Sequence, residues 1–263
     1  MARKNSPLGF VVALFDVLGF EFRLKKYGLD EIQSKYYKIV EIVNKNSEKN
    51  RILFEQLNIT APLMIADGPP MVFYDIRAIY SSDSILLWSN LAWKIVQDKS
   101  IETLRKNENH SAYGYLSKPV PLEPFLSMCA ELICRSIEID LPLRGAIAMG
   151  DAVLNETDKV FIGSPIVDAA RLEKEQKCIG LSICTSYIKQ QDHSKFFIPY
   201  SEHFKEDYRA ERNDCALNWP LYWLNSRNTD LINAIEEMAT RNDNHSYYLN
   251  TIEFIKYSQK YKY

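Results

Sequence analysis

The chain has 263 residues, of which 46% are hydrophobic and 12% aromatic. This composition is typical of a soluble globular protein that buries one sizeable core. Lys and Arg total 32 against 34 for Asp and Glu, a net charge of −2, so a basic field that binds nucleic acid is not expected. Five dispersed cysteines without zinc-ligand spacing are typical of reduced core residues in a cytoplasmic protein.

The N-terminal half is predicted to supply a strand, a helix and a β-hairpin. The first apolar run ends at Asp16, at about half the length that a membrane span needs. Apolar residues at helical spacing follow, and then two apolar runs flank the turn that carries Asp83. In chain order these elements are strand 10–15, helix 21–46 and strands 71–80 and 85–88, with an irregular stretch from Lys49 to Pro70.

The C-terminal half alternates helices and strands. Ser164 is expected to cap a helix that has Pro165 at its first position. Hairpins mixed with crossovers predict an α+β sheet with helices packed on it, for which the ferredoxin-like plan fits best. The expected elements are helices 91–107 and 122–139, strands 143–149 and 159–163, helix 164–174, strands 180–184 and 218–224, and one or two helices over 230–263.

Two acids, Asp16 and Asp83, each stand where a hydrophobic strand meets a turn. If their strands are neighbours, both carboxylates emerge at one edge of the sheet and can share a pair of Mg²⁺ or Mn²⁺ ions. Taken singly, each acid is more simply a turn or helix-cap carboxylate. Gly19 permits a tight turn whose N–H groups can face a triphosphate at the start of the helix.

Two arginines are also candidates for phosphate chemistry. Arg144 lies in an otherwise apolar strand and therefore needs a partner, which is either a phosphate or a carboxylate such as Asp151. Arg171 lies among small residues of a helix, where a planar and permanently charged group suits charge that develops on phosphorus. Without further context, Arg171 is an exposed arginine that pairs with Glu173 or Glu175.

Four segments resemble motifs of class III adenylate and guanylate cyclases, in the order of that family. Segment 15–20 (FDVLGF) resembles the first-strand motif, and segment 79–84 (IYSSDS) resembles the hairpin with the second metal-binding aspartate. Segment 143–150 (LRGAIAMG) is similar to the Arg-x-Gly-Ile-x-x-Gly strand, and segment 163–172 (GSPIVDAARL) to the Gly-Asn-x-Val-Asn-x-Ala-x-Arg helix. Together the motifs cover about residues 10–224.

The resemblance implies a ferredoxin-like cyclase catalytic domain over residues 1–225, followed by a helical extension over 226–263. It also implies two divalent metal ions, Mn²⁺ or Mg²⁺, held by Asp16, Asp83 and the backbone carbonyl of Val17. The reaction is then the in-line attack of a ribose 3′-oxygen on the α-phosphorus of a nucleoside triphosphate, with pyrophosphate leaving.

Further roles follow from the same resemblance. The amides around Gly19 and Phe20 would hold phosphates, and Arg144 would contact phosphate. Arg171 would stabilise the transition state from the opposite subunit, because the family forms head-to-tail dimers. A homodimer with composite active sites is therefore implied. The net charge and the short first apolar run separately predict no nucleic-acid partner and no membrane span.

The chain departs from the family where the base and the ribose are read. Ile79 and Val160 stand at the positions that read adenine, and neither side chain makes those hydrogen bonds. Val167 aligns with the asparagine that steadies the ribose. The late lysine that grips the triphosphate has no clear match, and Lys205 and Arg209 are candidates, with Arg212 as a further one.

These departures resemble the pyrimidine cyclases of the Pycsar anti-phage defence system. The implied substrate is UTP or CTP and the product cyclic UMP or cyclic CMP, with a slight preference for UTP. Tyr80, Phe73 or Tyr74 is expected near the base. The alternatives are an adenylate or guanylate cyclase and a catalytically inactive cyclase-homology module that binds a nucleotide.

Two more distant alternatives are a palm-like diguanylate cyclase or polymerase and a structural α+β interaction protein. Ser81-Ser82-Asp83 does not supply the Gly-Gly-Asp/Glu hairpin of the former. The latter leaves the acidic strand ends unexplained.

Overall fold

A computed structural model describes residues 9–64, 76–90, 122–184, 196–202, 204–205, 215–241 and 245–261. Its elements are, in order, β1 (Gly9–Val17), α1 (Phe20–Met64), β2 (Arg77–Ser81), β3 (Ser84–Asn90), α3 (Glu123–Glu138), β4 (Leu143–Asn155), β5 (Val160–Gly163), α4 (Ser164–Glu175), β6 (Gly180–Ile183), β7 (Phe197–Pro199), β8 (Cys215–Leu217), α6 (Trp219–Ser226), α7 (Leu231–Thr240) and α8 (His245–Lys260). Helices packed on a mixed sheet confirm the predicted α+β class. The predicted helix 91–107 lies outside the described residues.

The strands form one sheet in the order β2-β3-β1-β4-β6-β8-β7, and β5 pairs with β4 beside this path. The β4–β6 pair is parallel, and the other pairs are antiparallel. Helix α1 connects β1 to β2, and α3 connects β3 to β4. Each of these helices therefore crosses over a strand of the sheet, because β3 lies between β1 and β2 and β1 lies between β3 and β4.

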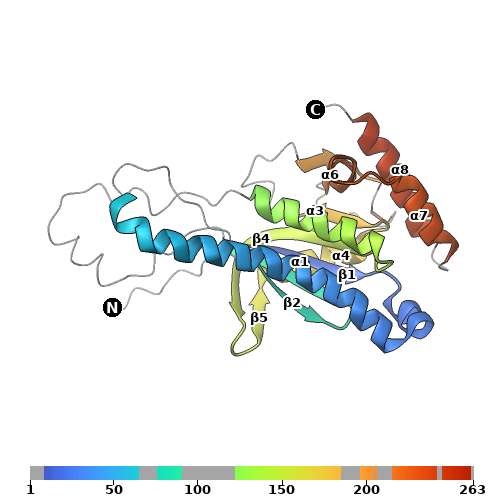
Figure 1. Cartoon of the computed structure of the whole chain (residues 1–263). Helices are drawn as coiled ribbons and strands as arrows, with labels where there is room; N and C mark the ends of the chain where they lie inside the picture. The colour runs from blue at the N-terminus through green and yellow to red at the C-terminus, as the bar shows by residue number, and fades with distance from the viewer. Residues whose placement is uncertain are drawn as a thin grey trace.

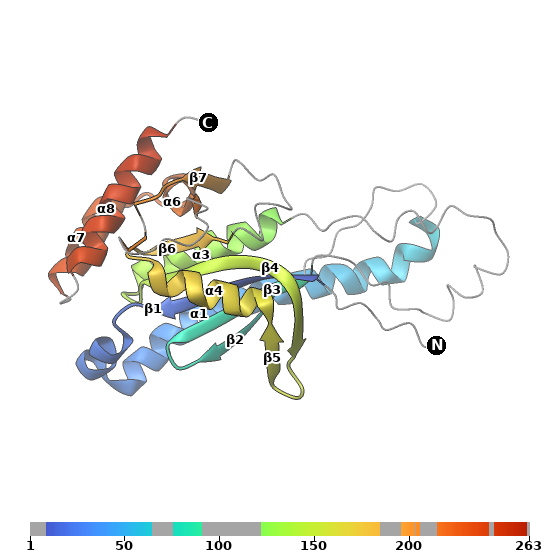
Figure 2. The same cartoon turned by 180° about the vertical axis from the view of Figure 1, so that it is seen from behind.

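The sheet is covered on both faces. Helices α1 and α3 lie on one face (Figure 1), and the view from behind shows α4 on the other (Figure 2). Along β1, Val11, Ala13 and Phe15 belong to the larger core with α1 and α3, whereas Val12 packs in a smaller cluster with Ala169 of α4. Since successive strand residues point to opposite faces, Asp16 lies on the face that α4 covers.

The predicted strand 218–224 is wrong, because this segment begins the helix α6, Trp219–Ser226. Pro220 stands in the first turn of the helix, where its missing N–H costs no hydrogen bond. Trp219 and Trp223, one turn apart, are both buried. A short apolar run does not distinguish a strand from a buried helix by its periodicity, and the preceding strand β8 already pairs with β6 and β7.

Several boundaries also differ from the expectation. Helix α1 continues through the stretch from Lys49 to Met64 that was expected to be irregular, and Gly28 (φ 77°) interrupts it. The N-cap of α4 is Gly163 and not Ser164, and no side chain caps this helix end. Strand β4 runs on to Asn155 and forms a hairpin with β5. Of the predicted strand 71–80, residues 71–75 lie outside the described residues, and β2 begins at Arg77.

Where one or two terminal helices were predicted over 230–263, the structure has two, α7 and α8, which pack against each other at the C-terminal end of the chain (Figure 1). Asp230 caps α7 by accepting hydrogen bonds from the N–H groups of Ile232 and Asn233. Leu231, Tyr248 and other buried side chains of both helices belong to the larger core of the sheet. The C-terminal helices are therefore buried in the same core as α1 and α3.

Candidate active site

The ends of two neighbouring strand segments bring Asp16 and Asp83 to one edge of the sheet. Asp16 lies opposite Ser84 in the β1–β3 register, and the N–H of Val17 donates to the carbonyl of Asp83 at 2.8 Å. Asp83 itself occupies the turn between β2 and β3. The predicted meeting of the two acidic strand ends is thus present in the fold.

The carboxyl of Asp16 is half-buried, and its pKa is raised. Burial is the largest cause, since it penalises the charged form. The guanidinium of Arg144 lowers the pKa, and the negative charge of Asp83 raises it. This mutual repulsion means that the two carboxylates share an environment in which a cation is favoured.

Arg144 connects β4 to this edge. Its Nε donates to Asp16 Oδ2 at 3.2 Å and lies 2.7 Å from Glu173 Oε1 of α4, an ion pair rather than a directed hydrogen bond. The expected carboxylate partner Asp151 is wrong, because that residue lies at the far end of β1, opposite Gly9. Gly145 allows the close strand pairing, since a Cβ there would lie 2.1 Å from the carbonyl oxygen of Leu14.

Two partners of Arg144 were not expected from the sequence. Glu173 is 6% exposed, and burial is the largest cause that raises the pKa of its carboxyl. The charge of Arg144 lowers this pKa, and the charge of Asp16 raises it. From α8, the hydroxyl of Tyr247 accepts a hydrogen bond from Arg144 Nη1 at 3.1 Å. The available signal for Glu173 was its place two residues after Arg171, which puts it on the opposite side of the helix.

The turn after β1 is held by a second arginine that the sequence did not single out. Gly19 adopts φ +65°, and a Cβ there would lie 2.9 Å from Arg23 Nη1. Arg23 is 1% exposed, and its guanidinium donates to the carbonyls of Leu18 and Asp140. Phe20 begins α1 directly after this turn. The sequence signal for Arg23 was its position three residues after Phe20, which puts a charged side chain on the buried side of the helix.

Ile79 and Tyr80 of β2 lie on opposite faces of the sheet. Ile79 packs with the cluster under α4, and Tyr80 packs with the larger core. The ring of Tyr80 meets that of Tyr36 edge to face, with centroids 6.2 Å apart. Both hydroxyls are buried and have no hydrogen-bond partner among the described residues. Burial and then the charge of Asp83 raise the pKa of Tyr36, which places this tyrosine within electrostatic reach of the acidic edge.

The remaining candidates of β5 and α4 lie on the surface. Val160 is 40% and Val167 46% exposed, and Arg171, one helical turn after Val167, is exposed as well. Within one chain, Arg171 therefore does not join Asp16 and Asp83. Its expected partner Glu173 points inward to Arg144 instead.

Lys205 lies beside the end of α4, far in sequence from the acids. Its backbone N–H donates to the carbonyl of Glu175 at 2.8 Å, and its exposed ammonium group donates to the carbonyl of Lys174. Its positive charge lowers the pKa of Glu173 against the effect of burial. Arg209 and Arg212 lie outside the described residues.

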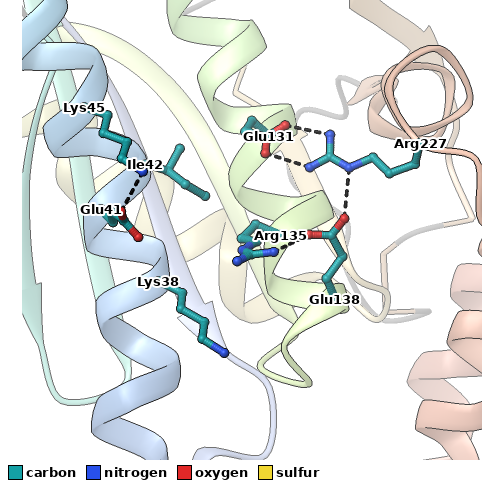
Figure 3. A pocket seen from close by; sticks show the side chains of 8 residues that line it. All are labelled: Lys38, Glu41, Ile42, Lys45, Glu131, Arg135, Glu138 and Arg227. Atoms are coloured by element: carbon teal, nitrogen blue, oxygen red, sulfur yellow. Dashed lines mark hydrogen bonds and ion pairs between the residues drawn. The ribbon is translucent and has the colours of Figure 1, made fainter.

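A separate depression lies between α1 and α3 (Figure 3). Arg227 binds Glu131 there through two hydrogen bonds of 2.7 and 2.6 Å and lies 3.1 Å from Glu138. Lys45 and Glu41 form a further pair at 2.6 Å. Internal ion pairs already occupy these charges, so we assign no ligand to this depression.

Neither protein-family models nor curated protein sequences give a match to this chain. Among the helices of the described segments, none has both the length and the apolar character that crossing a bilayer requires.

Proposed function

We propose that the chain is a nucleotidyl cyclase of the class III type, which closes a nucleoside triphosphate into a 3′,5′-cyclic monophosphate and releases pyrophosphate. The observation that carries the proposal is the meeting of Asp16 and Asp83 at one sheet edge, with Arg144 directly beside Asp16. The sequence motifs predict the same three residues in these roles.

The order of elements supports the proposal. The succession β1-α1-β2-β3-α3-β4, with β3 and β1 central among these four strands, is the ferredoxin-like plan. In this plan, the acidic ends of β1 and the β2–β3 hairpin are neighbours through the pairing of β1 with β3. This arrangement supports the proposal, because the resemblance expects the two acids at neighbouring strand ends.

The acidic edge fits divalent ions. No group of three or more His, Cys, Asp or Glu side chains suited to a metal occurs in the described segments, but Mg²⁺ is commonly bound by one or two carboxylates together with substrate phosphates. Asp16, Asp83 and the carbonyl of Val17 would hold the ions. When bound, the ions would lower the pKa of the ribose 3′-hydroxyl and neutralise charge on the triphosphate.

The protein's own groups would orient the triphosphate. The contacts of Arg144 use Nε and Nη1, which leaves Nη2 without a hydrogen bond among the described residues and available to a phosphate oxygen. The turn at Gly19 presents backbone amides at the start of α1, where anions are favoured. Together, these groups would hold the α-phosphorus for in-line attack by the 3′-oxygen.

A homodimer would complete the site. Arg171 is exposed and makes no hydrogen bond or ion pair with the acids of its own chain within the described segments, so it would stabilise the transition state of a partner's site. The β4–β5 hairpin offers a surface for a second copy: Val153 and Ile162 are cross-strand partners and are 50% and 61% exposed, and Val160 is 40% exposed. An apolar surface of this kind on a soluble domain indicates a binding partner.

Within this class, a pyrimidine nucleotide is the favoured substrate, UTP before CTP. Ile79 packs in an apolar cluster and Val160 is aliphatic, so neither supplies the polar group that reads a purine in the family. The protein would then make cyclic UMP, or cyclic CMP, as a second messenger of anti-phage defence.

The test is a nucleotide panel. Purified protein with Mn²⁺ is incubated separately with ATP, GTP, UTP and CTP, and pyrophosphate and cyclic product are measured. We expect turnover of UTP or CTP, loss of turnover to background in Asp16→Asn and Asp83→Asn, and a reduction of about 100-fold in Arg171→Ala. Asp151→Asn, which removes an exposed carboxylate from β4, is the control.

The ion pair between Arg144 and Asp16 favours a second candidate, a cyclase-homology module that binds a nucleotide without turnover, because the guanidinium competes with a metal for the carboxylate. Binding of a triphosphate without pyrophosphate release in any of the four reactions would support this module. Turnover of ATP or GTP alone would replace the pyrimidine assignment with a purine cyclase.

A further inference from the structure

Two arginines flank the acidic edge, and both are held by the C-terminal helix α8. Arg23 lies beneath the Gly19 turn, and its Nη2 donates to the hydroxyl of Tyr248 at 2.9 Å. Arg144 lies beside Asp16, and its Nη1 donates to the hydroxyl of Tyr247 at 3.1 Å. Two consecutive residues of one helix therefore contact the arginine beneath the Gly19 turn and the arginine beside Asp16.

The two contacts differ in their surroundings. Arg23 and Tyr248 are 1% and 2% exposed, so their hydrogen bond is shielded from water and its loss would leave a buried charge with one partner fewer. Arg144 and Tyr247 are partly exposed, and the guanidinium carbon lies 5.6 Å from the centre of the tyrosine ring. This distance is within the range of a cation–π contact.

Helix α8 is itself fixed to the sheet next to Arg144. Thr251 Oγ1 accepts a hydrogen bond from the N–H of Ile179 at 2.9 Å, and the side-chain amide of Asn250 donates to the carbonyl of Lys177 at 2.9 Å. These two residues lead into β6, whose Gly180 lies opposite Arg144 in the parallel β4–β6 register. The hydroxyls of α8 are thus held in a constant place relative to Arg144.

From this geometry we infer that the first two turns of α8 belong to the proposed active site, and that Tyr247 and Tyr248 are positioning residues. Tyr247 fixes the Nη1 side of Arg144, so that Nη2 is directed to an anion. Tyr248 fixes Arg23, which holds the Leu18–Gly19 turn in the conformation that presents its amides. The inference rests on the proposed function, since it assigns these tyrosines to the triphosphate site.

The test measures the binding of Mn²⁺-tripolyphosphate, a probe without base or ribose, by isothermal titration calorimetry of the full chain. Tyr247→Phe and Tyr248→Phe keep the rings and remove the hydroxyls. Tyr257→Phe removes a hydroxyl from the same helix, where the ring packs against Tyr200 and Tyr261 and not against either arginine. We expect the first two variants to bind the probe about tenfold more weakly, with KM for the nucleotide raised more than kcat is lowered, and Tyr257→Phe to bind as the unmodified chain does.

Each outcome decides the inference. Equal binding by the unmodified chain and both tyrosine variants would overturn the role of α8 and leave the proposed function standing. A fall in the thermal midpoint with KM unchanged, and with the apparent kcat and the fraction of binding-competent protein reduced through loss of folded protein, would assign the tyrosines a structural role only and would also overturn it. Failure of the unmodified chain itself to bind the probe would overturn the proposed function and the inference together.

Discussion

At the scale of the residue, the acidic edge holds charge that the fold does not fully compensate. Burial raises the pKa of Asp16 and of Glu173, although Arg144 contacts both carboxylates. The single guanidinium of Arg144 therefore offsets only part of the desolvation of Asp16 and Glu173, and the charge of Asp83 adds repulsion at Asp16. The buried thiols show the same effect of desolvation, because burial raises the pKa of Cys134, Cys178 and Cys184 to about 12. They therefore remain protonated at neutral pH.

The raised pKa of Asp16 predicts how stability depends on pH. A carboxyl whose pKa is higher in the folded than in the unfolded state stabilises the fold fully below its unfolded pKa, and this contribution is lost as the pH rises through the folded pKa. Because Asn does not titrate, Asp16→Asn removes this pH-dependent loss of stability. In buffer without divalent metals, we expect the free energy of unfolding of Asp16→Asn to rise relative to that of the native chain between pH 4 and pH 7.

Urea denaturation at a series of pH values measures this difference. Asp151→Asn controls for the removal of one negative charge at an exposed position. A difference between Asp16→Asn and the native chain that stays constant, or that falls as the pH rises, would contradict the assignment of an uncompensated charge at the acidic edge.

At the scale of the element, the β4–β5 hairpin has two different faces. Leu154 and Phe161 pack with Trp88 and the cluster under α4, whereas Val153, Val160 and Ile162 point outward and are 40% to 61% exposed. A strand pair that only covered the sheet would be polar on its outer face. The outer face of the hairpin is therefore suited to contact with a second copy of the chain.

Ile162→Glu tests this face. The change places a charge in the centre of the exposed apolar surface, where burial in an interface would leave it unpaired. We expect the native chain to be a dimer by sedimentation velocity, and Ile162→Glu to be monomeric, folded and without turnover. Leu224→Glu is a matched control, because Leu224 of α6 is 50% exposed and lies outside both the hairpin and the proposed site.

A monomeric native chain that still turns over nucleotide would contradict both the interface and the composite site. A dimer that persists in Ile162→Glu would place the interface on another surface.

At the scale of the whole molecule, the C-terminal helices are integrated with the sheet. Phe254 of α8 is 1% exposed, and its ring lies 4.9 Å from that of Tyr200 and 6.3 Å from that of Trp219. Ser258 donates to the side chain of Asn218 at 2.5 Å. Helix α8 thus shares buried contacts with α6 and with residues directly after β7 and β8, and it is expected to unfold together with them.

We predict that Phe254→Ala lowers the stability of the whole molecule. Removing a fully buried aromatic side chain costs about 3–5 kcal/mol, and thermal unfolding should remain a single transition at a lower midpoint, followed by circular dichroism and by tryptophan fluorescence. Leu249→Ala on the same helix should change stability by less than about 0.5 kcal/mol. Two separate transitions, with only one of them affected by Phe254→Ala, would show that residues 226–263 form an independent unit.

The sequence alone determined those features that depend on local pattern. The strand that ends in Asp16, the hairpin that carries Asp83, the helix after Gly163 and the two C-terminal helices follow from alternation, helical spacing and turn residues, which act within a few positions of the chain. The same patterns placed both acids at strand ends, because Asp favours turns and apolar residues favour the buried strands before them.

Only the tertiary structure decided which partners the charged side chains meet, and whether the apolar run at 218–224 forms a strand or a helix. Arg144 meets Glu173 and Tyr247, which lie 29 and 103 positions later in the sequence, and Arg23 meets Asp140 and Tyr248. Such pairs form because a guanidinium taken out of water needs hydrogen-bond or charge partners. Which carboxylate or hydroxyl it meets depends on which elements the packing brings together. Local pattern identifies a charge that needs a partner, and the assembled core determines which residue becomes that partner.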